Sequence, residues 1–228
     1  MAMRQVDKII RQAAREALAP MGLFQKGSSR IWLDDNGWFL TVVEFQPSAW
    51  SQGAYLNVGA SFLWEQGAGF WEALPYNYTF GAISRELHHV EYTGDDGNFY
   101  RAMLDMAEHA RGSAAQYRAR LDTPEHACRP WQERCARRGW NVRDAWNSVM
   151  LCCLAGDLAA GDAWLDTILE REPRESGIGW AEALRRLAEE TRDLPGRQAF
   201  VVRSIQEKRA RLRAKASYKK LPVDPAYQ

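Results

Sequence analysis

Residues 30–46 read RIWLDDNGWFLTVVEFQ, and this stretch decides the fold. Asn36-Gly37 lies between two runs rich in β-branched and aromatic residues, which is the strongest short signal for a β-hairpin. The second run, 38–46, has apolar residues at both odd and even positions, so both faces of the strand are apolar. We therefore expect a central strand that is covered on both faces. Pro47 ends this strand because proline cannot donate a hydrogen bond to the ladder.

Two further strands are predicted after this hairpin. Residues 54–64 form the first, and residues 88–92 form a short last strand that ends before a turn. Between them, residues 65–87 are rich in glycine and aromatic side chains, and we expect a long ordered loop there. Upstream, residues 3–18 place apolar side chains three and four positions apart, which predicts an amphipathic helix on the surface.

From residue 98 onward the pattern is helical. Thr123-Pro124 and Asn141 are typical helix starts, and Gly156 is a typical helix end. We therefore predict an α+β fold in which an N-terminal helix packs on a four- to five-stranded antiparallel sheet, followed by a C-terminal helical bundle of about five helices. The expected division is 1–95 for the helix and sheet, 96–216 for the helical bundle packed on it, and 217–228 for a tail.

The composition is that of a globular protein. Of the 228 residues, 46% are apolar and 26% are charged, which excludes a disordered chain, a fibre and a disulfide-stapled miniprotein. The longest apolar stretch, 149–155, falls far short of the ~20 residues of a membrane span, and the charged N-terminus lacks the core of a signal peptide. All four cysteines lie in predicted helices. We therefore expect reduced thiols in a cytoplasmic protein that makes no membrane contact.

Positive charge is concentrated at the C-terminal end of the chain. The whole chain has a net charge of +1, whereas its last 33 residues carry nine Lys and Arg against two Asp and Glu. Such a block is either a solvated helix or a contact for an acidic partner such as a nucleic acid. The candidate contact residues are Lys208, Arg209, Arg211, Arg213 and Lys215.

The sequence contains none of the familiar motifs for catalysis, phosphate binding or metal binding. His126, Cys128 and Cys135, together with the adjacent Cys152-Cys153 pair, invite a zinc hypothesis. However, the first three lie within one predicted helix, and a spacing of two places side chains on different faces. We therefore expect no metal and no cofactor. An enzyme is the weaker hypothesis on these grounds, although missing motifs do not exclude one.

Residues 145–173 resemble one tetratricopeptide-type helical hairpin. Gly156 stands in the turn, Gly161 at the close-packing position and Pro173 at the end. Ser148-Val149 departs from the Leu-Gly that the repeat has there, and a solenoid needs about three repeats for stability. A generic helical hairpin is therefore the alternative. The resemblance implies a protein-contact surface in this half of the chain.

The first half of the chain carries a set of short motifs. Met21-Gly22-Leu23-Phe24-Gln25-Lys26 follows the N-terminal helix, Phe45-Gln46-Pro47-Ser48 ends the central strand, and Tyr55-Leu56-Asn57-Val58-Gly59 lies in the next strand. This set resembles an uncharacterised bacterial family known only as a domain of unknown function, and Leu23 stands where that family often has Phe. The resemblance implies a helix followed by an antiparallel sheet in a bacterial, cytoplasmic protein. It implies no activity, substrate or catalytic residue.

A candidate binding site lies where the central strand ends. Gln46 ends that strand, Trp50 lies in the following loop, and Tyr55 and Asn57 share one face of the next strand. Carboxamides beside aromatic side chains suit the binding of a peptide or a base. The alternative is structural: Gln46 and Asn57 satisfy backbone groups, while Trp50 and Tyr55 cover the core.

These observations favour two functions from different classes. The first is a non-catalytic protein-binding module, of immunity or antagonist type, because catalytic motifs are missing and aromatic side chains are enriched at interfaces. The second is a nucleic-acid or nucleotide-binding protein that uses the basic C-terminal helix. An enzyme without recognisable motifs is the third hypothesis.

Overall fold

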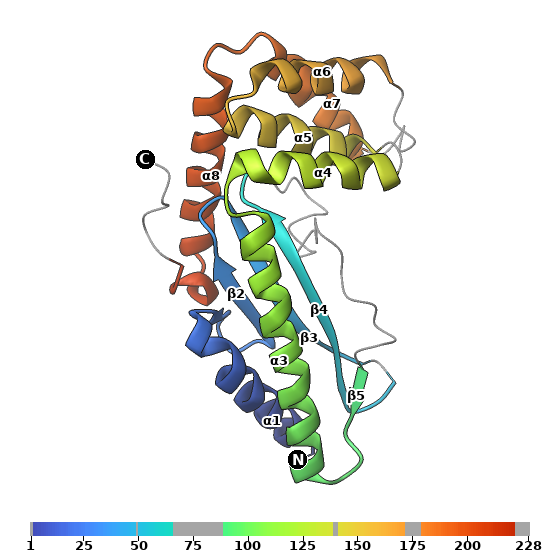
Figure 1. Cartoon of the computed structure of the whole chain (residues 1–228). Helices are drawn as coiled ribbons and strands as arrows, with labels where there is room; N and C mark the ends of the chain where they lie inside the picture. Colours follow the sequence, from blue (N-terminus) through green and yellow to red (C-terminus); the bar gives the residue numbers. More distant parts are fainter. Residues whose placement is uncertain (1, 49, 66–88, 139–140, 172–178, 222–228) are drawn as a thin grey trace. The chain divides into compact units, whose positions relative to one another are not determined.

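The structure is a computed structural model that describes residues 2–48, 50–65, 89–138, 141–171 and 179–221. Its elements are α1 (Ala2–Leu18), η1 (Ala19–Met21), β1 (Phe24–Gln25), β2 (Ile31–Asp35), β3 (Phe39–Pro47), β4 (Gly53–Phe62), β5 (His89–Glu91), α3 (Asp96–Arg120), α4 (Pro124–Arg138), α5 (Val142–Leu154), α6 (Leu158–Glu170), α7 (Gly179–Arg192), α8 (Arg197–Arg213) and η3 (Ala216–Tyr218) (Figure 1). This order confirms the predicted α+β fold, with an N-terminal helix, antiparallel strands and then helices. The expected loop 65–87 lies outside the described residues, apart from Glu65.

The chain divides into two compact units. We call Met1–Ala119 with Lys208–Gln228 the sheet unit, and Arg120–Glu207 the helical unit. The change from strands to helices comes between β5 and α3. However, α3 belongs to the sheet unit, because its apolar side chains share one core with the sheet. The last turns of α8 also belong to this unit.

Five strands form one antiparallel sheet in the order β1-β2-β3-β4-β5. The hairpin between β2 and β3 turns at Asn36-Gly37, where the N–H of Asn36 donates to the carbonyl of Phe39 at 3.0 Å. Gly37 has a φ of 80°, a left-handed conformation that glycine adopts without steric cost. The predicted hairpin, with a positive φ at one of its two turn residues, is confirmed.

One face of the sheet packs against α1 and α3, as Figure 1 shows. The central strand β3 contributes Val43 and Phe45 to this core, and β4 contributes Leu56 and Val58, all with no exposed surface. Fully burying a side chain of this kind stabilises the fold by about 1.5–3 kcal/mol. The next residues along β3, such as Val42, are buried on the opposite face. The prediction of a central strand covered on both faces is therefore confirmed.

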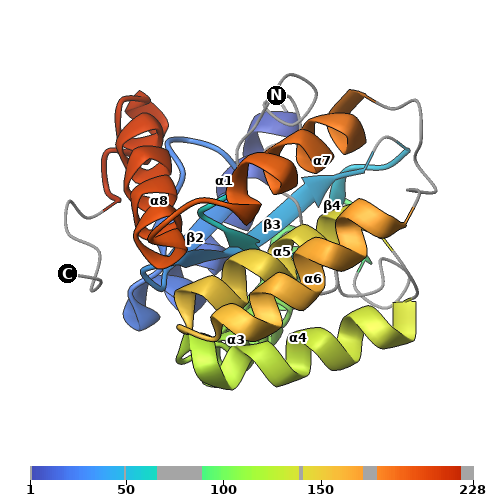
Figure 2. The ribbon, with the colours of Figure 1, turned by 90° about the horizontal axis from the view of Figure 1, so that it is seen from above.

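The helices α4, α5, α6 and α7 are neighbours in the helical unit (Figure 2). The side chain of Asn141 caps α5 by accepting hydrogen bonds from the N–H groups of Arg143 and Asp144, at 2.9 and 3.0 Å. Gly156, after the end of α5, has a φ of 80°. The predicted start and end of this helix are therefore confirmed. A Cβ atom on Gly161 of α6 would lie 3.3 Å from the sulfur of Cys153, so the two helices approach closely there.

Candidate functional site

A group of polar side chains lies on the sheet face opposite α1 and α3. The register pairs Glu44 of β3 with Asn57 of β4, and Gln46 with Tyr55. It also pairs Tyr55 with His89 of the edge strand β5. Because side chains alternate between the two faces of a strand, all five point to the same face. We call this group the polar face.

Asn57 is the centre of the polar face. Its side-chain N–H group donates to Oε1 of Gln46 at 2.9 Å and to Oε2 of Glu44 at 3.1 Å. Only 4% of Asn57 is exposed, so these bonds satisfy an amide that would otherwise be buried without partners. The structure thus brings the two expected carboxamides together. They bind each other rather than standing apart as two independent contacts.

Tyr55 and His89 form the outer part of the polar face. Their rings stack with centroids 4.3 Å apart. The Nε2 atom of His89 lies 3.4 Å from Oγ of Ser51. The arrangement therefore offers an aromatic surface with hydrogen-bonding groups at its rim.

Trp50 lies in the loop between β3 and β4, and 93% of its surface is exposed. The hydroxyl of Ser48 accepts hydrogen bonds from the N–H groups of Trp50 and Ser51, at 3.1 and 3.2 Å. These bonds fix the backbone of the loop while the indole stays in solvent. The alternative in which Trp50 covers the core is therefore wrong. Among the described residues, the exposed large hydrophobic side chains are Trp50 and Leu158.

The basic C-terminal helix has two kinds of cation. Arg209 is 2% exposed, and its guanidinium binds the carboxylate of Asp35 at 2.5 and 2.8 Å and the carbonyl of Gly37 at 2.9 Å. The Nζ atom of Lys208 donates to the carbonyl of Glu65 at 2.9 Å. Arg211 and Lys215 are exposed, whereas Arg213 is half-buried. Two of the five candidate contact residues are therefore used for bonds within the sheet unit.

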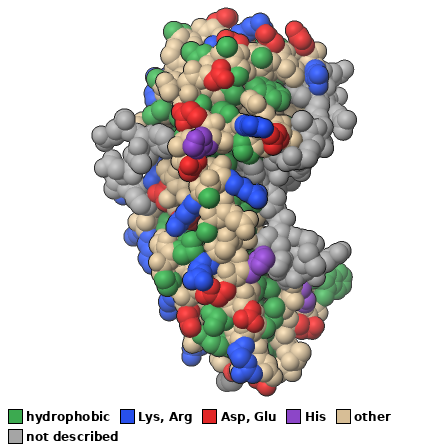
Figure 3. Space-filling view, in the orientation of Figure 1, with side chains coloured by type: hydrophobic (Ala, Val, Ile, Leu, Met, Phe, Trp, Pro, Cys, Tyr) green, Lys and Arg blue, Asp and Glu red, His purple; other side chains and the backbone are tan. Residues whose placement is uncertain are grey.

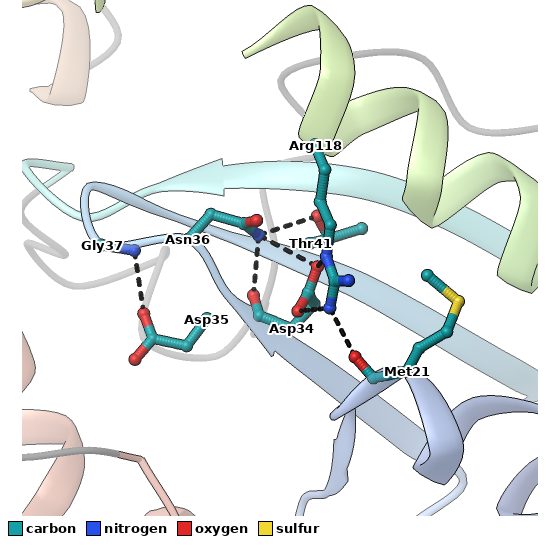
Figure 4. A network of polar contacts seen from close by, with 7 residues as sticks. All are labelled: Met21, Asp34, Asp35, Asn36, Gly37, Thr41 and Arg118. Atoms are coloured by element: carbon teal, nitrogen blue, oxygen red, sulfur yellow. Dashed lines mark hydrogen bonds and ion pairs between the residues drawn. The ribbon is translucent and has the colours of Figure 1, made fainter. Parts of the chain in front are cut away.

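A second ion pair, in which only the carboxylate is buried, ties α3 to the hairpin (Figure 4). Arg118 binds both carboxylate oxygens of Asp34, at 2.6 and 2.7 Å, and donates to the carbonyl of Met21 at 2.7 Å. The side-chain amide of Asn36 donates to Oδ2 of Asp34 and to the hydroxyl of Thr41, both at 3.2 Å. The hydrogen bond that Arg118 donates to Asp34 is the main cause that raises the pKa of Arg118. This saturated network has a structural role.

Among the described residues, those of the zinc hypothesis do not gather into one cluster of metal ligands. The side chain of His126 is 72% exposed and contacts Asp122, whereas Cys135 is buried beside Ser148. The described residues include no group of three His, Cys, Asp or Glu side chains that could hold a metal ion. Where the structure describes the chain, no helix has the length and apolar character to cross a bilayer.

Sequence reasoning missed three members of the site. Glu44, Ser51 and His89 were not among the candidates, although the alternation of β3 places Glu44 and Gln46 on one face. The link to His89 depends on the register between β4 and β5, which no local pattern specifies. On the face of the molecule seen in Figure 3, acidic and basic side chains are interspersed.

A comparison with protein-family models, curated proteins and solved structures finds no match to this chain. The resemblance to a bacterial family of unknown function therefore stays a prediction.

Proposed function

We propose that this chain is a non-catalytic protein-binding module, and that its partner contacts the end of the sheet at Trp50. We further propose that the module is of immunity or antagonist type and that it acts in a bacterial cytoplasm. The observation that carries it is the exposure of Trp50 on a loop whose backbone is held by Ser48. Tryptophan is enriched among the few residues that dominate the energy of protein interfaces, because its large rigid ring loses little conformational entropy on binding.

The surroundings of Trp50 suit a protein partner. Ser51 connects the loop to His89, and the carbonyl of Gln52 accepts a hydrogen bond from the N–H of Tyr92 at 2.6 Å. The loop is therefore attached to the edge of the sheet at two points. An aromatic anchor on a fixed loop, with polar groups beside it, has the composition of an interface centre with a polar rim.

A variant of Trp50 tests this proposal. Protein partners are captured from the source cells on the immobilised full-length chain, identified, and then measured in purified form. We expect Trp50→Ala to weaken the affinity of the partner at least tenfold, because truncation of such an anchor costs about 2 kcal/mol or more. Leu158→Ala, at the other exposed hydrophobic side chain, is the matched control and should leave the affinity unchanged. A partner bound equally well by Trp50→Ala would contradict the proposal.

The nucleic-acid hypothesis is the second candidate. It is favoured by the exposed cations Arg211 and Lys215, whereas the structural bonds of Lys208 and Arg209 reduce the charge that a phosphate backbone could meet. An anisotropy titration with RNA and DNA at two salt concentrations distinguishes the two functions. Binding that falls steeply with salt and is lost in Arg211→Ala/Lys215→Ala would favour this candidate over the first. We expect no such binding.

A further inference from the structure

The antiparallel packing of α4 and α5 brings two cysteines face to face. The indole Nε1 of Trp131 donates to Oγ of Ser148 at 3.0 Å. Cys135 lies one turn after Trp131 in α4, and Asp144 lies one turn before Ser148 in α5. The thiol of Cys135 is 3.9 Å from the carbonyl oxygen of Asp144. Later residues of α4 thus contact earlier residues of α5, as expected for antiparallel helices. This register places Cys128, one turn before Trp131, opposite the last turn of α5.

Cys152 lies in that last turn, and its thiol faces α4. The side-chain amide of Gln132 lies 4.0 Å from its sulfur. Cys128 lies one turn before Gln132 on the same side of α4 and so faces Cys152, and each of the two thiols shifts the pKa of the other. Cys152 is 1% exposed, whereas Cys128 is only half-buried. Cys128 is therefore the more accessible thiol of the pair, and Cys152 is covered.

The two thiols differ in acidity in a way that suits sequential chemistry. The hydrogen bond with Cys152 lowers the pKa of Cys128. The same bond, together with burial, raises the pKa of Cys152. Because the thiolate is the nucleophile, Cys128 is the first of the two to react with a reagent from solution.

We propose that Cys128 and Cys152 form a reversible disulfide that staples α4 to α5 when the protein meets a small-molecule disulfide. The thiolate of Cys128 attacks one sulfur of the small disulfide, forms a mixed disulfide and releases one small thiolate. Cys152 then attacks the sulfur of Cys128, and its proton passes to the second small thiolate as that group leaves. In total the two protein thiols are oxidised to one disulfide, and one small disulfide is reduced to two small thiols.

The other two cysteines are placed for packing rather than for this reaction. Cys153 points toward α6, where its sulfur lies 3.3 Å from the position of a Cβ on Gly161. Burial raises the pKa of Cys153 to about 11. Cys135 is buried beside Asp144 and Ser148. These residues supply matched controls, since Cys153 adjoins one reacting cysteine in the sequence and Cys135 lies on the same helix as the other.

The test is thiol counting and peptide mapping on the full-length chain. The folded protein is incubated with oxidised glutathione, denatured in acid, alkylated and analysed by mass spectrometry. We expect two of the four thiols to be lost, one peptide pair joined through Cys128 and Cys152, and recovery of all four thiols with dithiothreitol. Cys153→Ser and Cys135→Ser should form the same bond, whereas Cys128→Ser and Cys152→Ser should not.

Several results would overturn this inference. Four free thiols after incubation, a stable glutathione adduct on Cys128, or a bond that involves Cys135 or Cys153 would each show that the pair does not close. The wild-type peptide map decides the question even if a serine variant fails to fold. The outcome is independent of the proposed binding function, because no partner protein enters the experiment.

Discussion

At the hairpin end of the sheet, Asp34 and Asp35 point to opposite faces, and each pairs with an arginine from a different helix. Asp34 binds Arg118 of α3, and Asp35 binds Arg209 of α8. At the other end of β3, which we call the Trp50 end, the short loop between β3 and β4 carries an exposed indole. The carboxylates at the hairpin end thus make bonds that stabilise the fold. The indole at the Trp50 end is exposed to solvent instead.

This difference separates residues that stabilise the protein from residues that are available for a partner. A buried charge must be compensated, so removing one member of a buried pair is costly even where the pair itself adds little. An exposed indole contributes little to the folded state and a great deal to an interface. Variants at the two ends should therefore change different quantities.

We expect the largest effect from Asp35→Ala. This change leaves the guanidinium of Arg209, which has 3% of its side chain exposed, without its carboxylate. The free energy of unfolding should fall by about 3–5 kcal/mol, as measured by urea denaturation. Asp105→Ala, at an exposed position of α3, is the control and should stay within about 0.5 kcal/mol of wild type.

A double variant shows whether the charge itself is responsible. Asp35→Leu/Arg209→Met replaces the pair with apolar side chains, and most of the stability should return, because neither charge is left uncompensated. If Asp35→Ala alone is as stable as wild type, the hairpin end does not have the structural role assigned to it.

Arg118→Ala should have a smaller effect. Its side chain is 39% exposed, so water replaces part of its bond to Asp34, and Asn36 continues to donate to that carboxylate. We expect a loss of about 1–2 kcal/mol in the same denaturation experiment. Arg118→Lys should recover only part of it, because lysine cannot bind both oxygens in the same way. Full recovery by lysine would contradict the bidentate geometry.

Asp96, in the first turn of α3, should give the smallest change in stability. The hydroxyl of Tyr92 donates to its carboxylate at 2.7 Å and the amide of Gln5 at 2.8 Å. These bonds lower the pKa of Asp96, that of Tyr92 being the larger cause. The stabilisation is therefore present above the unfolded pKa of about 3.9 and is lost as the pH falls through the lower folded value. Asp96→Asn should be less stable than wild type at pH 7, with a difference that shrinks below about pH 4. A pH-independent difference would contradict this assignment.

Local patterns in the sequence predict the hairpin end only in part. Asn36-Gly37 specifies its turn within two residues, because only glycine adopts the left-handed conformation at no cost. The partners of the two aspartates lie 84 and 174 positions away, and no periodicity connects residues at such distances. The basic pattern of α8 likewise indicates cations on several faces, but it does not indicate that Arg209 meets a carboxylate at the sheet.

The polar face could likewise be predicted only in part from the sequence. Alternation along a strand places Tyr55 and Asn57 on one face. The stacking of His89 on Tyr55 depends on a three-residue edge strand whose register is set by tertiary packing. The exposure of Trp50 could not be predicted either, because a tryptophan next to a strand is as suited to a core as to a surface.

Site-specific photo-crosslinking at Trp50 tests the central claim most directly. A photoreactive phenylalanine analogue, which keeps a large aromatic side chain at the site, is placed at position 50 in the full-length chain, and at Gln116, exposed on α3, as the control. On irradiation in the source cells, we predict one protein adduct from position 50 and none from position 116. Adducts to nucleic acid, equal adducts from both positions, or no protein adduct from position 50 would contradict the claim that the Trp50 end is a protein-binding surface.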